Sequence, residues 1–283
     1  MGDSTGIYST FIDESSFNLT TKTLYEWGDD TLKSFEQNIK KYPTDKDLIT
    51  YRENPIEYKL NNHGYRSGID FTKGLTGNIY LGDSHTVGIG QYFEDTWAYK
   101  LNQKIGGNYI NLAEGGEGIA SGFRKLISYI DYFNIENVFI NYPHNYRYEY
   151  WFEEKRHYYT LRPIQEDMYQ PWFGKLHKML LAEERNNIFY NTSNLYAIIG
   201  LCKSKNIPVY NYSKELAGYH IHGGRKARDL SHAPTGLHDE IVNEMYEKYT
   251  TNQQADTDSP AENLIRDVNS IQESKKKWIK KLY

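Results

Sequence analysis

The sequence predicts an α/β fold in which a parallel sheet is covered by helices. Short apolar runs after Gly77 are typical of buried strands, and they comprise residues 79–81, 109–112, 138–142 and 207–212. Helical spacing of apolar residues separates these runs, with Trp97, Leu101 and Ile105 in the first gap and Phe123, Leu126, Ile127 and Ile130 in the second. Because parallel neighbours need a crossover connection, the alternation favours a parallel sheet.

Two more helices are expected further along the chain. The first carries Leu195, Ile198, Ile199 and Cys202, and the second carries Leu237, Ile241 and Met245. Residues 148–187 are longer than a crossover requires and rich in aromatic side chains, so they are expected to form an insertion beside the site.

The chain is expected to divide into three parts. Residues 1–76 form an irregular N-terminal layer packed on the core, in which only residues 31–42 are predicted to be helical before Pro43 ends the helix. Residues 77–249 form the α/β domain, and residues 250–283 form a polar linker and an amphipathic helix.

The C-terminal helix is predicted from the capping box Ser259-Pro260-Ala261-Glu262. Apolar residues then recur at spacings of four and three, interrupted by Lys275, as in a short heptad seam. This helix either packs on its own domain or serves self-association or protein docking. The lysines near its end are interpreted as a solvated face.

Composition narrows the class of partner. The 283 residues include 33 basic and 37 acidic side chains, a net charge of -4, which does not favour nucleic acid. Neither a signal peptide nor a membrane-spanning segment is visible, so the protein is expected to be soluble, with no membrane partner. The single Cys202 permits no intramolecular disulfide and is expected to be buried.

Ser84 is the candidate nucleophile. The tetrapeptide Gly82-Asp83-Ser84-His85 directly follows an apolar strand, and α/β sheets place their sites at the carboxyl ends of strands. On its own such a tetrapeptide is more often a structural turn. A serine hydroxyl also needs a base and an orienting carboxylate, so a downstream Asp and His pair decides in favour of catalysis.

Asp229 and His232 supply that pair, because they lie three residues apart and can meet in a turn. A zinc site built from His220, His222, His232, His238 and Asp229 is the alternative. It is less favoured, since the spacing matches no closed set of zinc ligands. No metal and no cofactor are therefore expected.

Donors for an oxyanion are expected at two other strand ends. Asn111-Leu112-Ala113-Glu114-Gly115-Gly116 follows the second strand, where glycine lets the backbone approach a ligand closely. Asn141-Tyr142-Pro143-His144-Asn145 follows the third, and the Asn145 amide is the candidate donor. Asn141 is its rival.

These four blocks resemble, in chain order, the SGNH (GDSL-like) hydrolase superfamily. The resemblance spans about residues 77–249, with Ser84 in the serine block, Gly116 in the glycine block, Asn145 in the asparagine block and His232 with Asp229 in the last. It implies a three-layer, flavodoxin-like fold and ester hydrolysis through an acyl-enzyme without a metal. It also implies an oxyanion hole made by the Ser84 and Gly116 amides and the Asn145 side chain.

The sequence departs from the family pattern at two places. His85 replaces the usual leucine after the serine, and His144 and Tyr146 flank Asn145 where the family has other residues. His85, His144 and Tyr146 are candidate substrate contacts, although structural roles for the histidines are equally compatible with the pattern. Residues 62–71 also resemble SGNH-like proteins of bacteriophages, which suggests a cytoplasmic or virion-associated protein.

Three functions remain in competition. The first is a serine esterase acting on a small-molecule or glycan ester, for example an O-acetyl group on a carbohydrate, with the aromatic insertion as a sugar platform. The second is a weakly active or inactive SGNH scaffold that serves as a structural or binding component, for example of a phage particle. A lipid-directed lipase ranks last, because no apolar lid helix is visible.

Overall fold

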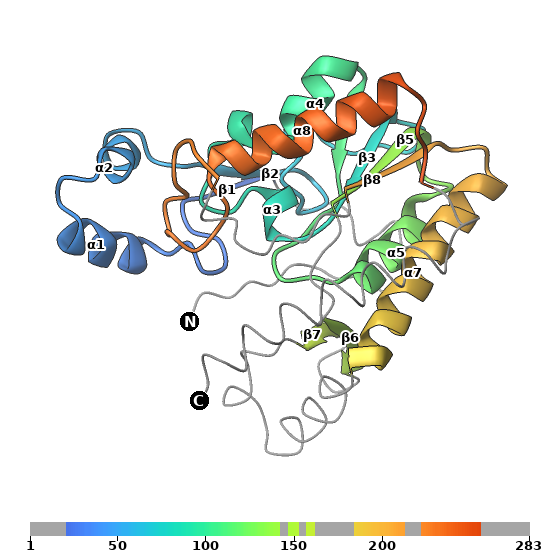
Figure 1. The fold of residues 1–283 in the computed structure, drawn as a ribbon, viewed down its shortest axis with the longest axis horizontal. Coiled ribbons are helices and arrows are strands. Elements are labelled where there is room, and N and C mark those ends of the chain that lie inside the picture. The colour runs from blue at the N-terminus through green and yellow to red at the C-terminus, as the bar shows by residue number, and fades with distance from the viewer. Residues whose placement is uncertain (1–20, 142–146, 153–156, 162–183, 213–221, 256–283) are drawn as a thin grey trace.

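A computed structural model of the chain describes residues 21–141, 147–152, 157–161, 184–212 and 222–255 (Figure 1). Their centre is a parallel sheet of four described strands, in the order β4-β3-β5-β8. The strands are β3 (Thr76–Leu81), β4 (Asn108–Asn111), β5 (Asn134–Asn141) and β8 (Val209–Tyr212). The predicted α/β fold with a parallel sheet flanked by helices is therefore confirmed.

Helices cover both faces of the sheet, which makes three layers. Helices α4 (Trp97–Ile105) and α8 (Thr235–Thr250) lie side by side on one face, and α5 (Ile119–Tyr129) and α7 (Glu184–Ser204) cover the other (Figure 1). Successive strand residues point to opposite faces. Tyr80 and Phe139 thus join the core under α4 and α8, whereas Ile79 and Val138 join the core under α5 and α7.

Each face has its own kind of core. Under α4 and α8 the rings of Tyr80, Phe139 and Tyr210 stack with centroid separations of 5.4 and 5.2 Å. Under α5 and α7 the side chains are mostly aliphatic, and Cys202 is fully buried among them. The four helices follow the apolar spacing in the sequence, which places their buried side chains on one stripe.

The N-terminal layer contains more regular structure than the sequence predicts. The predicted helix is α1 (Leu32–Lys41), capped by the Thr31 side chain. The layer also holds α2 (Lys46–Glu53) and an antiparallel pair, β1 (Lys22–Leu24) with β2 (Tyr58–Leu60). The expectation of a single helix was wrong, because α2 is too short to show an apolar period and depends on its Asp45 cap.

The described part of the aromatic insertion contains two paired strands. Strands β6 (Tyr148–Phe152) and β7 (His157–Leu161) pair antiparallel, and the last residues of the insertion lie in α7. The predicted C-terminal helix lies outside the described residues. Within the part of the chain that is described, no helix combines the length and apolar character needed to cross a bilayer.

Candidate active site

Ser84 lies where the central strand β3 ends and the short helix α3 (Ser84–Val87) begins. Its side chain is buried with 7% of its surface exposed. The preceding Asp83 caps α3 by accepting a 3.0 Å hydrogen bond from the His85 backbone N–H. Gly82 makes the sharp turn possible, because it has φ +153° and a Cβ there would collide with the Thr86 hydroxyl.

Asp229 and His232 are joined directly. The distance between His232 Nδ1 and Asp229 Oδ2 is 2.5 Å, and the same carboxylate oxygen accepts from the Ser231 hydroxyl at 2.7 Å. The other oxygen, Oδ1, accepts the backbone N–H groups of Ser231 and His232, each at 3.1 Å. These four donors fix the carboxylate, and the imidazole is held through Nδ1, which leaves Nε2 for chemistry.

The contact between Asp229 and His232 shifts the pKa of both side chains. Burial would raise the pKa of Asp229, but the hydrogen bonds from His232 and Ser231 outweigh burial and lower it to about 2. Burial would lower the pKa of His232, but the bond to Asp229 and the nearby carboxylates of Asp83 and Asp29 raise it. At neutral pH Asp229 is therefore ionised and stabilises a positive charge on His232.

His232 lies against the helix that begins with Ser84. The rings of His232 and His85 meet edge to face, with centroids 5.6 Å apart. No hydrogen bond joins the Ser84 hydroxyl to His232 among the described residues, and such bonds are often long before substrate binds. The Asp229 and His232 pair thus lies beside the short helix that begins with Ser84 at the end of β3, and its contact there is with His85.

The glycine loop after β4 lies next to the serine loop. The Glu114 N–H donates to the Gly82 carbonyl at 3.4 Å, and Gly116 adopts φ +82°. Below the loop, the buried Lys125 ammonium donates to the Leu112 carbonyl at 3.0 Å and pairs with Glu114 at 3.1 Å and with Glu117. Burial together with the Glu117 charge raises the pKa of Glu114 to about 8 against the opposing effect of Lys125.

Asn141 is the described asparagine at the end of β5. Its side chain is 1% exposed, and among the described residues neither polar atom of its amide has a hydrogen-bond partner. Its carbonyl lies close to Gly82 in the serine loop. Asn145, His144 and Tyr146 lie outside the described residues, so their predicted roles stay predictions.

Arg147 also contacts this edge of the sheet, and no motif in the sequence predicts it. Its Nη1 atom donates to Asp83 Oδ2 at 2.7 Å and to the Glu117 carbonyl at 2.7 Å. Arg147 therefore links the serine loop to the glycine loop. Only its place two residues after Asn145 could have drawn attention to it.

The other histidines of the zinc alternative have separate partners. His222 Nδ1 lies 3.1 Å from Glu240 Oε2, and His238 Nδ1 accepts the Trp97 backbone N–H at 3.1 Å. His220 lies outside the described residues. Within those residues no three His, Cys, Asp or Glu side chains are grouped as metal ligands.

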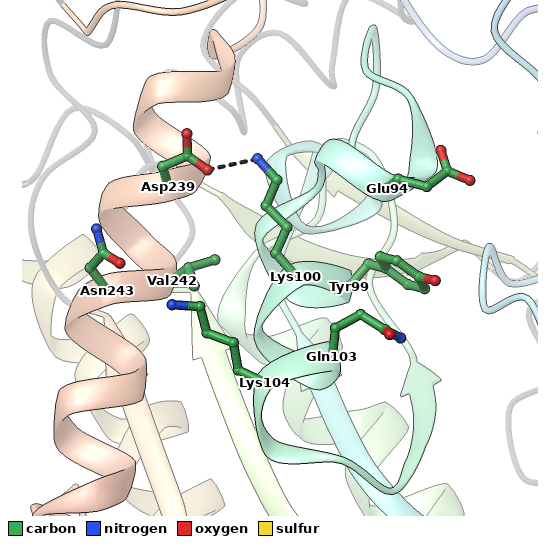
Figure 2. Close-up of a pocket in the computed structure, with 8 residues that line it drawn as sticks. All are labelled: Glu94, Tyr99, Lys100, Gln103, Lys104, Asp239, Val242 and Asn243. Atoms are coloured by element: carbon green, nitrogen blue, oxygen red, sulfur yellow. Dashed lines mark hydrogen bonds and ion pairs between the residues drawn. The ribbon is translucent and has the colours of Figure 1, made fainter.

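A groove elsewhere on the surface contains none of the predicted site residues. It has a volume of about 380 Å³ and lies between α4 and α8, as Figure 2 shows. Its lining comprises Glu94, Tyr99, Lys100, Gln103, Lys104, Asp239, Val242 and Asn243. Lys100 and Asp239 form an ion pair at 2.6 Å across it. The candidate triad residues Ser84, Asp229 and His232 all lie at the sheet edge and none of them lines this groove.

The fold and this edge define a parallel α/β protein with a serine and an Asp-His pair beyond its strand ends. The sequence matches no protein-family model and no curated protein. Among solved structures, the chain is similar to TesA, with 13% identity, a TM-score of 0.34, and coverage of 62% of this chain and 98% of that one. It is also similar to the psychrotrophic esterase EstA from Pseudoalteromonas sp., in a structure inhibited by monoethylphosphonate. That match has 16% identity, a TM-score of 0.36, and coverage of 62% and 97%. These values are too low to carry either protein's activity over to this chain.

Proposed function

We propose that the chain is a serine hydrolase that cleaves an ester bond through an acyl-enzyme, with Ser84 as nucleophile. The observation that carries the proposal is the 2.5 Å bond between Asp229 and His232, whose ring lies against the helix that begins with Ser84. A buried carboxylate, an imidazole and a serine at the carboxyl ends of parallel strands are the parts that acyl transfer requires.

The reaction follows from these three groups. Ser84 Oγ attacks the ester carbonyl carbon while its proton passes to His232 Nε2, and Asp229 stabilises the imidazolium. The tetrahedral intermediate then collapses, and the leaving alkoxide takes the proton from His232. In the second half His232 deprotonates a water that attacks the acyl-Ser84 ester. Ser84 recovers the proton as the carboxylic acid leaves.

The oxyanion needs donors at fixed positions. We assign this role to the backbone amides of Ser84 and Gly116 with one asparagine side chain. The family resemblance suggests Asn145, whereas Asn141 is supported by its buried amide, which has no partner in the part of the chain that the structure describes.

The proposed substrate class is a carbohydrate ester such as an O-acetyl sugar. Strand β6 starts at the residue after Arg147, whose side chain contacts Asp83 beside Ser84, so the insertion begins next to the nucleophile. The paired strands bring aromatic residues opposite one another, Tyr150 with Tyr159 and Trp151 with Tyr158. Aromatic faces are suited to stacking on sugar rings.

The test is labelling by a fluorophosphonate probe, compared among the native chain, Ser84→Ala, His232→Ala and Ser67→Ala. Ser67 is a buried serine whose hydroxyl donates to the Tyr109 carbonyl, and it serves as the matched control. Labelling that disappears in the first two variants and persists in the third supports an activated Ser84. Turnover of a short-chain ester should fall about 10³-fold or more in Ser84→Ala.

A folded native chain that takes no label would instead favour the alternative, an inactive scaffold used for binding. That alternative depends on the predicted C-terminal helix, which lies outside the described residues. The carbohydrate proposal has its own test, in which Trp151→Ala should lower kcat/KM for an acetylated oligosaccharide but not for a p-nitrophenyl ester. Equal losses on both substrates would contradict a sugar platform.

A further inference from the structure

A closed ring of hydrogen bonds joins the N-terminal layer to the candidate active site. The Asp30 carboxylate accepts from the Tyr58 hydroxyl at 2.5 Å and from the Arg228 guanidinium at 2.7 and 2.8 Å. The Tyr58 hydroxyl in turn accepts the Gly90 N–H at 2.9 Å. The Gly90 carbonyl accepts the Arg228 backbone N–H at 2.9 Å and closes the ring.

The ring connects the two loops that carry the proposed chemistry. Gly90 lies in the turn that follows the Ser84 helix, and Arg228 directly precedes Asp229. Only glycine fits at position 90, because its φ is +76° and a Cβ would lie 2.9 Å from the Ala227 Cβ and 3.1 Å from Asp229 Oδ1. The serine loop and the Asp-His loop are therefore in direct contact at Gly90.

The Asp-His loop is held in a conformation that its own sequence does not favour. Leu230 has φ +59°, in the left-handed region that a branched side chain rarely adopts. Its side chain packs against the apolar core of the N-terminal layer, which includes Phe35 and Leu48. The Asn38 amide from α1 donates to the Asp229 carbonyl at 3.3 Å. Packing and hydrogen bonds from the layer thus hold the loop in this shape.

The serine loop is held by the same layer. The Arg66 guanidinium, fully buried, donates to the carbonyls of Val87, Gly88 and Gln91 at 3.1, 2.7 and 3.0 Å. These carbonyls belong to the end of the Ser84 helix and the turn after it. Both catalytic loops therefore take their positions from residues that lie before the sheet in the chain.

We propose that the N-terminal layer is a positioning element for catalysis, in which Asp30 and Tyr58 set the place of Asp229 and His232 relative to Ser84. The inference rests on the proposed function and deepens it. A buried ion pair such as Asp30 with Arg228 contributes little net stability, since desolvation offsets its attraction. Its value lies in geometry, because Arg228 anchors the Asp-His loop to Asp30 and to the Tyr25 carbonyl, and Tyr58 connects Asp30 to Gly90 in the serine loop.

The test is Tyr58→Phe, which removes one hydroxyl and no charge. The control is Tyr80→Phe, another fully buried tyrosine, whose hydroxyl donates to Asn102 at 3.0 Å in the core under α4 and α8 and takes no part in the ring. The readout is the pKa of the His232 imidazole by NMR of histidine-labelled protein, assigned with His232→Gln. The groups that face His232 from other elements, Asp83, His85, Asp29 and His238, are unchanged in both variants.

Tyr58→Phe should loosen the Asp229 and His232 bond, so the pKa of His232 should fall by about 0.5 or more toward the ordinary histidine value of about 6.5. Tyr80→Phe should lower the melting temperature and leave this pKa unchanged. Where an ester substrate is turned over, kcat should fall about tenfold in Tyr58→Phe with an unchanged KM.

The half-buried variant Asn38→Ala should move the pKa of His232 in the same direction by a smaller amount, and it carries the test if Tyr58→Phe does not fold. An unchanged pKa in Asn38→Ala and in folded Tyr58→Phe would overturn the inference, as would equal shifts in Tyr58→Phe and Tyr80→Phe. Because the NMR readout needs no turnover, its failure is distinguishable from a failure of the fluorophosphonate labelling.

Discussion

Arg147 donates to Asp83 at 2.7 Å, and this contact ties the insertion to the residue before the candidate nucleophile. Asp83 is fully buried, and the Arg147 side chain is 12% exposed. The same guanidinium nitrogen reaches the Glu117 carbonyl at 2.7 Å. This side chain therefore links the serine loop to the glycine loop, beside the direct bond from the Glu114 N–H to the Gly82 carbonyl. In the proposed reaction the separation of these loops decides whether two backbone amides can reach one oxyanion.

We expect Arg147→Met to lower kcat by about 10²-fold, because a misplaced reacting geometry costs that much. Arg124→Met is the matched control, since Arg124 pairs with Glu149 at 2.6 Å at a similar depth but contacts neither loop of the candidate site. Both variants should lose stability, and kcat for a small ester should fall only in the first. Arg147→Lys should restore part of the rate. Equal rate losses in the two methionine variants would show that Arg147 acts only through stability.

The pH dependence of hydrolysis should follow His232. The imidazole must be neutral to accept the Ser84 proton, and its pKa is raised by Asp229 against the effect of burial. Activity should therefore be present at alkaline pH and be lost as pH falls through a value above the ordinary histidine pKa of about 6.5. The profile of kcat/KM measures this limb, with circular dichroism at each pH as the control for folding. A limb at or below the ordinary value would contradict the raised pKa.

The sheet and its covering helices could be predicted because they depend on local patterns. The apolar run that contains Ile79 and Leu81 predicts a buried strand, and the spacing of Trp97 and Leu101 predicts a helix. The hydrogen-bonded ring around Asp30 could not be predicted, since Asp30 and Arg228 are 198 residues apart in the chain. Helix α2 could not be predicted for a different reason. It is stabilised by its cap and by two buried side chains, Leu48 and Tyr51, and it has no repeating apolar pattern.

The candidate site also contains residues that local patterns in the sequence predict and residues that they do not. Ser84, Asp229 and His232 lie in short motifs whose spacing has chemical meaning, so they could be singled out in advance. Arg147 has no such motif, and only the fold brings it to Asp83. Tertiary contacts of this kind follow from loop paths, which residue spacing does not determine.

Asn141→Leu and Asn145→Ala should identify the asparagine that serves the oxyanion. Asn141 is buried, and its amide has no hydrogen-bond partner among the described residues, which lowers the stability of the folded state. Asn141→Leu should therefore keep or raise the melting temperature while kcat falls about 10²- to 10³-fold, as for loss of an oxyanion donor. An unchanged kcat in Asn141→Leu with a large loss in Asn145→Ala would assign the role to Asn145.

The lysine beneath the glycine loop should be indispensable to the fold of that loop. Lys125 is 2% exposed and neutralises Glu117 beside a second carboxyl, Glu114, whose pKa is raised to about 8 by burial and by Glu117. Lys125→Met would leave a buried charge without its partner, so it should cost about 3–5 kcal/mol in unfolding free energy. Lys100→Met, which breaks the more exposed pair with Asp239, should cost less than about 1 kcal/mol. Chemical denaturation of both variants measures the difference. Burial raises the pKa of Glu114 in the folded protein, so this carboxyl lowers stability at neutral pH, and Glu114→Gln, which resembles the protonated form, should keep or raise the unfolding free energy there. A loss in Glu114→Gln as large as that in Lys125→Met would mean that Glu114 is ionised in the folded protein and shares the lysine charge with Glu117.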